Sequence, residues 1–299
     1  MSVALLAAVK GYSTFDVEPW VISLNRSGFK GKKYVLVYDN NEELINYFHK
    51  HNIEVILQTD EGLSHIATQR FRDYAILLSS EKCNDIDYVI HTDIRDVVFQ
   101  TNPGKWVLDN IGDQEIIASG EGIKYRHEDW NGEGVQYQFG KEYFDEFVDY
   151  ETLCSGVIAG TKDGFISLCE AMTEIAFYTE DIGGFIDQHF YNIALRKIFN
   201  EVTNFVPPTK PWAANLGTLI AIPMNNPDWS TGPRTGSLSY ERFREGSFID
   251  NMLCGLPRMI SGQVCTPAGE PYAIVHQYDR YMPWKNELIE NFSVTKYVS

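Results

Sequence analysis

Short apolar runs alternate with longer amphipathic segments at the start of the chain, and this alternation restricts the fold more than any other feature. Apolar runs at 3–9, 34–38 and 53–57 have the length of buried strands, and segments 15–27 and 42–51 between them have the pattern of helices. Parallel strands need such crossover helices, whereas antiparallel strands can be joined by tight turns. The pattern therefore predicts an α/β fold with a mainly parallel central sheet flanked by helices.

The same alternation continues along the chain. Further helices are predicted at 65–79, 163–178 and 185–198, with a short one after Asn102-Pro103, and further strands at 87–92, 115–119, 154–160 and 272–275. The first 120 residues have the organisation of a nucleotide-binding α/β half. We therefore expect a single domain over residues 1–299, with a nucleotide-binding half at 1–120 and a second half at 121–299.

Residues 120–140 interrupt this pattern. The segment is rich in glycine, charge and aromatic residues and has no clear period. A long irregular segment in a compact protein is typically a functional loop or a disordered one, and disordered segments are poor in aromatic residues. We therefore predict a functional loop that contains Trp130.

Composition excludes several partners. The chain carries 41 acidic and 25 basic residues, a net charge of -16, which argues against nucleic acid or an anionic membrane as a main partner. The five cysteines are odd in number, widely spaced and without a CxxC pair, as expected of a reduced, cytoplasmic protein. The apolar run at 3–9 is too short to span a membrane.

The stretch IDYVIHTDIRDVVFQ, residues 86–100, contains the strongest candidate site. Asp93 and Asp96 follow a buried strand, and ligands bind at the carboxyl edge of open α/β sheets. Two carboxylates a few ångströms apart repel by about 3 kcal/mol at an effective dielectric constant of about 20, and a divalent cation such as Mg²⁺ or Mn²⁺ relieves this repulsion. The alternative is a surface turn in which Arg95 pairs with a neighbouring carboxylate.

Three other positions have both a functional and a structural interpretation. Asp187-Gln188 could face a ligand or simply cap a helix. Arg70 could neutralise a phosphate or form a surface ion pair. His276 could be a core or surface histidine with ordinary partners, and the metal-ligand interpretation gains weight only if the last strand lies beside the Asp93 strand. The Walker loop, GxGxxG after the first strand, HExxH and GxSxG are all absent, which removes several enzyme classes.

Taken in order, four motifs resemble those of glycosyltransferases with the GT-A fold, which use a nucleotide-diphosphate sugar and a divalent metal. The motifs are the strand YVIHTDIRD at 88–96 with a DxD-like end, CSGV at 154–157, Asp187-Gln188 with Asn192, and His276 followed by Pro283-Trp284. This order is similar to that of the retaining, glycogenin-like and bacterial galactosyltransferase-like members.

The resemblance implies a GT-A, Rossmann-like fold with a mixed, mainly parallel sheet, and a sugar and acceptor half at 121–299. It implies Mn²⁺ or Mg²⁺ held by Asp93, Asp96 and His276, and Asp187 and Gln188 as catalytic residues. Arg95 stands at the third DxD position, so either Asp96 takes that role through a turn or Asp93 acts with His276 alone. The donor nucleotide is expected to contact Ala8, Lys10, Gly11, Tyr12, Arg70, Tyr74, Ser155 and Gly156.

The expected reaction is transfer of a sugar from a UDP- or GDP-sugar to a hydroxyl of a glycan or another acceptor, with retention of anomeric configuration. Trp130 and its segment would shape the acceptor site. Two alternatives stay open at this point: a sugar-phosphate nucleotidyltransferase, whose basic, glycine-rich loop the sequence AVKGYS lacks, and a catalytically silent nucleotide- or carbohydrate-binding protein, which Arg95 favours.

Overall fold

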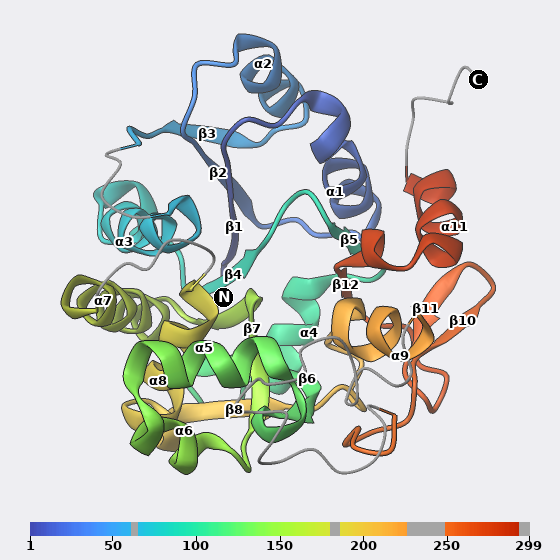
Figure 1. Ribbon diagram of the computed structural model, residues 1–299. Helices are drawn as coiled ribbons and strands as arrows, with labels where there is room; N and C mark the ends of the chain where they lie inside the picture. Colours follow the sequence, from blue (N-terminus) through green and yellow to red (C-terminus); the bar gives the residue numbers. More distant parts are fainter. Residues whose placement is uncertain (61–64, 180–185, 226–248, 293–299) are drawn as a thin grey trace.

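The computed structural model describes residues 1–60, 65–179, 186–225 and 249–292. Its centre is a seven-stranded sheet (Figure 1). In spatial order the strands are β3 (Glu54–Leu57), β2 (Lys32–Val37), β1 (Val3–Val9), β4 (Tyr88–Thr92), β7 (Glu151–Thr161), β6 (Ile116–Lys124) and β8 (Thr203–Val206).

This sheet is mixed and mainly parallel. The neighbours among β3, β2, β1 and β4 are parallel, β7 is antiparallel to both β4 and β6, and β8 is parallel to β6. The predicted α/β class with flanking helices is confirmed, and the sheet is compatible with a Rossmann-like fold.

Helices cover both faces of the sheet, so the central strand β1 is apolar along its whole length. Its alternate side chains enter two separate cores, with Val3, Leu5, Ala7 and Val9 on one face and Ala4 and Leu6 on the other. The first face is packed against α1 (Thr14–Arg26), α2 (Glu42–Lys50) and α4 (Pro103–Asn110). The second is packed against α3 (Ile66–Leu78), α7 (Lys162–Tyr178) and α8 (Asp187–Lys197).

A second, three-stranded sheet lies beside the first. It consists of β5 (Val97–Phe99), β12 (Ile274–His276) and β9 (Ala213–Asn215), and β12 is its middle strand. β12 is antiparallel to β5 and parallel to β9. One side of this small sheet packs with α11 (Met282–Phe292) through Val98, Val275 and Leu288.

The remaining elements lie in the second half of the chain, apart from one helical turn between α3 and β4. They are α5 (Asp129–Phe139), α6 (Lys141–Phe147), α9 (Ile222–Asn225), β10 (Arg258–Ile260), β11 (Gln263–Cys265) and short helical turns at Glu81–Cys83, Tyr125–His127, Asn200–Val202, Gly217–Ala221 and Tyr278–Arg280. Helix α11 was not predicted, because few of its side chains are buried and its apolar pattern is weak.

The prediction of an irregular loop over 120–140 is wrong. Strand β6 continues to Lys124, and α5 follows after one helical turn. Gly132 and Gly134 obscure the helical pattern, but Gly134 has a packing role: a Cβ there would lie 1.9 Å from Cε1 of His189 on α8. The Glu128 carboxylate caps α5 by accepting from the N–H groups of Trp130 and Asn131.

The described part of the chain contains no membrane-spanning helix and no disulfide bond. Within the ranges given above, no helix is both long enough and apolar enough to cross a bilayer. All five cysteines are free, with Cys254 half-buried and the others buried.

Candidate metal centre and functional site

A short turn joins the two sheets. Strand β4 of the central sheet ends at Thr92, the chain turns through 93–96, and β5 of the small sheet begins at Val97. The backbone N–H of Asp93 donates to the carbonyl of Gly156 in β7 at 2.8 Å, which anchors the start of the turn. The turn therefore presents acidic side chains at the junction between the sheets.

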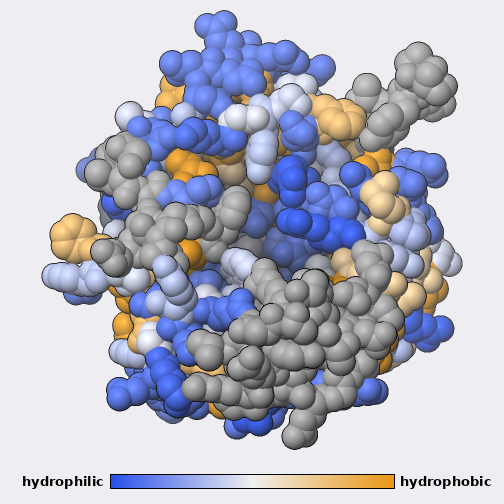
Figure 2. All heavy atoms as spheres, in the orientation of Figure 1, coloured by the Kyte–Doolittle hydropathy of each residue, from blue (hydrophilic) through white to orange (hydrophobic). Residues whose placement is uncertain are grey.

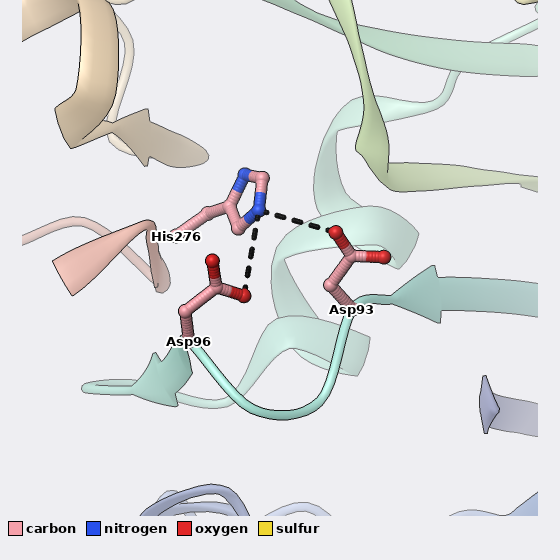
Figure 3. A group of neighbouring side chains, drawn as sticks. All are labelled: Asp93, Asp96 and His276. Carbon is pink, nitrogen blue, oxygen red and sulfur yellow. Dashed lines mark ion pairs between the residues drawn. The ribbon is translucent and has the colours of Figure 1, made fainter. Parts of the chain in front are cut away.

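Asp93, Asp96 and His276 converge at this junction (Figure 3). The Nε2 atom of His276 lies 3.4 Å from Oδ2 of Asp93 and 3.9 Å from Oδ1 of Asp96. One ligand atom from each residue lies within 4.8 Å of the others. Ligands around an octahedral Mg²⁺ with bonds of about 2.1 Å are roughly 3 to 4.2 Å apart, so this spacing is close to that of a cation site.

Arg95 contacts this cluster only through Asp96 among the described ion pairs. Its guanidinium pairs with Asp96 at 3.4 Å and with Asp279 at 3.3 Å. The turn after β4 breaks the strand alternation that would have placed Asp93 and Arg95 on one face. Of Arg95 and Asp96, the two residues considered for the second acidic position of the DxD-like motif, Asp96 is the one that faces His276.

The space between these side chains fits a small cation. Gly156 borders it, and a Cβ at this position would lie 2.5 Å from Cε1 of His276 and 2.9 Å from Oδ2 of Asp93. The Nε2 atom of His276 is buried and has no hydrogen-bond partner among the described residues. Carboxylate and imidazole donors suit Mn²⁺ and Mg²⁺ in the way that the sequence predicts.

The electrostatic environment differs between the two carboxylates. Burial opposes ionisation of Asp93, but the positive charges of Arg70 and His276 outweigh it and lower the pKa of this carboxyl. Burial and the nearby charge of Asp93 raise the pKa of Asp96, although His276 opposes the shift. A bound cation would stabilise both carboxylates in the ionised form.

Arg70 connects the cluster of Asp93, Asp96 and His276 to the start of α8. Its Nη1 atom pairs with Oδ1 of Asp93, and Nη2 lies 3.1 Å from Oδ2 of Asp187. Asp187 also accepts a hydrogen bond from the Ser155 hydroxyl at 2.9 Å. Burial raises the pKa of Asp187, and the charge of Arg70 counteracts that effect. Arg70 is 7% exposed and therefore acts inside the site.

Gln188 belongs to a second buried network. Its Oε1 accepts from the backbone N–H of Ser155 at 3.4 Å, and its Nε2 donates to Asn131 at 2.9 Å and to Glu121 at 3.4 Å. Burial and the nearby charge of Glu128 raise the pKa of Glu121 to about 7. The predicted catalytic pair is thus held by hydrogen bonds on both of its residues.

Asn192 has a structural role in positioning that pair. Its side chain accepts from the N–H of Leu153 at 3.0 Å and donates to the Leu153 carbonyl at 2.7 Å. It also donates to the carbonyl of Gln188 at 2.8 Å. These bonds attach the first turns of α8 to β7.

The predicted nucleotide-binding segment lies at the same sheet edge. Ala8, Lys10, Gly11 and Tyr12 lie at and beyond the carboxyl end of β1, which runs parallel to β4. Burial raises the pKa of Tyr12, and its phenol also experiences the charges of Arg95, Asp93, Asp96 and Arg70. Tyr12 is half-buried, while Lys10 is exposed and pairs with Asp60.

Tyr74, in contrast, is not brought to the site surface. It is 0% exposed, and its ring packs against Phe71, His91 and Phe165 in the core. A nucleotide at the sheet edge has no access to this ring, so the expected contact is not supported. Arg70 and Tyr74 are both buried, and Arg70 is the one that pairs with Asp93 and Asp187.

Trp130 stands at the start of α5, next to α8. Its indole is 39% exposed and lies 4.9 Å, between ring centroids, from the imidazole of His189. It is therefore presented by a helix rather than by the predicted loop.

Two polar residues of the site were not identified from the sequence. Asp39 follows β2, and its Oδ2 accepts from the N–H of Gly11 at 2.5 Å. A carboxylate directly after a buried parallel strand was the signal that could have found it. Asn215 ends β9 and contacts His276, with Oδ1 3.1 Å from Nδ1. No pattern in the sequence indicates this contact, because β9 is only three residues long.

Figure 2 shows a hollow near the centre of the viewed face, with mainly hydrophilic residues on the walls that are coloured. It lies in the region where Figure 1 places β4, β5 and β12.

Comparison with known proteins adds no identification: no family model matches the chain, and no curated protein matches it.

Proposed function

We propose that this protein is a metal-dependent glycosyltransferase with the GT-A fold. It would move a sugar from a UDP- or GDP-sugar to a hydroxyl of a glycan or another acceptor. The observation that carries this proposal is the convergence of Asp93, Asp96 and His276 at the sheet edge where Arg70 connects them to Asp187. The mixed, mainly parallel sheet supports the proposed fold.

The donor would lie along the carboxyl edge of the central sheet. Residues 8–12 would contact the base and ribose, with Tyr12 available to stack on the base. Asp93, Asp96 and His276 would hold Mn²⁺ or Mg²⁺ beside the diphosphate. When bound, the cation supplies positive charge that stabilises the departing nucleoside diphosphate.

Asp187 and Gln188 would contact the transferred sugar. Asp187 is buried and already accepts from Arg70 and Ser155, so it can accept from sugar hydroxyls only in a fixed direction. The Gln188 amide is held by Ser155 and Asn131 and would lie near the anomeric carbon. Arg70 acts here as a positioning residue, because both of its terminal nitrogens are engaged with carboxylates rather than directed at a phosphate.

The acceptor would approach from the α5 side. Trp130 offers a partly exposed indole next to α8, and sugar rings stack on such surfaces. Retention of configuration is part of the proposal. It is tested by determining the anomeric form of the first product by NMR, before any mutarotation.

A donor panel tests the reaction class. The protein is incubated with UDP-, GDP- and CMP-sugars and Mn²⁺, and the products are separated. Release of free nucleoside diphosphate from one donor is the expected result. Exchange of pyrophosphate would instead indicate a nucleotidyltransferase, and binding without turnover would indicate a silent binding protein.

The same panel is read by thermal shift with and without metal. We expect stabilisation by one donor nucleotide that depends on Mn²⁺ in the natural protein and is lost in Asp93→Asn. Asp109→Asn is the matched control, because Asp109 is an exposed carboxylate that pairs only with Lys105 among the described contacts. Equal donor stabilisation in both variants would remove the metal from the proposal.

A further inference from the structure

The small sheet holds His276 between β5 and β9. In its register His276 is the partner of Val97 on one side and of Asn215 on the other. Asp96 directly precedes Val97, and its Oδ1 lies 3.9 Å from Nε2 of His276. His276 is 2% exposed and Asn215 is 0% exposed.

The orientation of the Asn215 amide follows from its second contact. Its Nδ2 atom lies 3.1 Å from the backbone carbonyl of Gly120 in β6. A carbonyl can only accept a hydrogen bond, so the NH₂ group must face Gly120. The amide oxygen consequently faces Nδ1 of His276, at 3.1 Å.

We propose that Asn215 is a positioning residue that makes His276 a metal ligand, an inference that depends on the metal centre of the proposed function. Because the Asn215 oxygen can only accept, Nδ1 of His276 must carry the proton in this hydrogen bond. The lone pair that binds a cation is then on Nε2, the atom that faces Asp93 and Asp96. Outer hydrogen bonds of this kind set the tautomer and ring orientation of metal-binding histidines.

Cys154 is the other group at Nδ1, with its Sγ 3.3 Å away. The sulfur of a thiol is a weak hydrogen-bond acceptor compared with an amide oxygen. Asn215 is therefore the residue that decides where the imidazole proton resides, and Cys154 provides a comparison at the same atom.

Two substitutions at position 215 separate the proposed role from simple packing. Asn215→Leu and Asn215→Asp both remove the donor to Gly120, but only Asn215→Leu removes the acceptor for His276. We expect Asn215→Leu to weaken Mn²⁺ binding about 10- to 100-fold, and Asn215→Asp to retain affinity within about threefold. Cys154→Ala should also bind within about threefold of the natural protein.

The experiment measures Mn²⁺ binding by electron paramagnetic resonance, without any sugar donor, after circular dichroism has shown that each variant is folded. In parallel, ¹⁵N NMR of histidine in the Mg²⁺-loaded natural protein should show a proton on Nδ1 and none on Nε2 of His276. This second measurement needs no variant that could fail to fold.

Three results would overturn the proposal. They are unchanged Mn²⁺ affinity in folded Asn215→Leu, equal losses in Asn215→Asp and Asn215→Leu, and a His276 proton on Nε2 in the Mg²⁺-loaded protein. A natural protein that binds no Mn²⁺ would overturn the metal centre as well. Normal Mn²⁺ binding with the expected pattern, but no donor turnover, would overturn only the proposed reaction.

Discussion

Asp93 and His276 lie in the same site but are held there by different interactions. Asp93 leaves the end of a central strand and is held by charge, because Arg70 pairs with it and also with Asp187. His276 is held by backbone register, because the small sheet fixes it between Val97 and Asn215. Asp93, Arg70 and Asp187 form the large-sheet part of the site, which depends on an ion-pair network. His276 and Asn215 form the small-sheet part, which depends on strand pairing.

The two parts should therefore tolerate different substitutions. In the large-sheet part, loss of one charge leaves its partners buried and unpaired, which is costly. In the small-sheet part, a side chain can change while the register still presents its neighbours. Substitutions in the large-sheet part should therefore lower the free energy of unfolding, whereas substitutions in the small-sheet part should mainly affect binding.

The largest effect on stability is expected from Arg70→Met. This variant keeps the length of the side chain but leaves Asp93 and Asp187 without their shared cation. Breaking a buried ion pair typically costs 3–5 kcal/mol, and the partial exposure of Asp93 favours the lower end, about 3 kcal/mol. Urea unfolding measures the free energy of unfolding, and added Mn²⁺ should restore part of the loss by neutralising Asp93.

Lys105→Met is the matched control, since Lys105 forms an exposed pair with Asp109 on α4. Exposed pairs of this kind contribute little, so no measurable change is expected. A similar, small loss in both variants would contradict the view that charge holds the large-sheet part together.

The next effect contrasts the two carboxylates. Both Asp93→Ala and Asp96→Ala should lower donor turnover about a hundredfold or more, because both remove metal-binding charge. Only Asp93→Ala should also lower the free energy of unfolding, since the pKa of Asp93 is lowered by Arg70 and His276 whereas burial raises the pKa of Asp96. Donor turnover and urea unfolding are measured for both variants. An equal loss in the free energy of unfolding would contradict the expected difference between Asp93 and Asp96.

The two parts of the site were also unequally predictable from the sequence. Strand β4 and the Asp93 that follows it were predicted, because a buried parallel strand is a continuous apolar run. Of the small sheet, only the last strand was predicted, at 272–275, close to β12 (Ile274–His276). β5 and β9 have three residues each, and the pairing of the three strands joins distant segments, so the sheet itself was not predicted. The resemblance to a family named His276, but only the register explains how it meets Asp96 and why Asn215 accompanies it.

The burial of individual side chains could not be predicted from the sequence either. The pattern of α3 placed Arg70 and Tyr74 on one face, yet one enters the site and the other remains in the core. Gly132 and Gly134 made α5 look like a loop, because the close approach of α8 that requires Gly134 depends on tertiary packing. Such contacts override local propensity.

Gly156→Ala tests the junction between the two parts. A Cβ would enter the space between His276 and Asp93, so we expect Mn²⁺ affinity to fall about 30-fold, corresponding to about 2 kcal/mol of overpacking. Gly255→Ala is the control, because its Cβ would be 3.5 Å from the nearest atom, Cβ of Pro267. Mn²⁺ titration followed by electron paramagnetic resonance compares the two, and equal affinities would show that the space at Gly156 is not needed for a cation.

The smallest expected effect concerns Glu121, beside Gln188. Burial and the charge of Glu128 raise the pKa of Glu121 to about 7 from an ordinary value of 4.5. Between these pH values the native carboxyl keeps a proton that the unfolded chain has lost, so stability falls as pH rises through this window. A shift of this size corresponds to at most about 3 kcal/mol, and about 2 kcal/mol is expected because the denatured state is not fully solvated.

Glu121→Gln should therefore remove part of the pH dependence of the natural protein. Urea unfolding at pH 5 and pH 8 measures the loss of stability between the two conditions, which should be about 2 kcal/mol smaller in Glu121→Gln. The exposed Glu81→Gln variant is the control and should retain the full loss, because Glu81 lies on the surface, outside the Gln188 network. If Glu121→Gln also retains it, the carboxyl of Glu121 is ionised in the native protein, and the Gln188 network carries a buried negative charge next to the proposed sugar site.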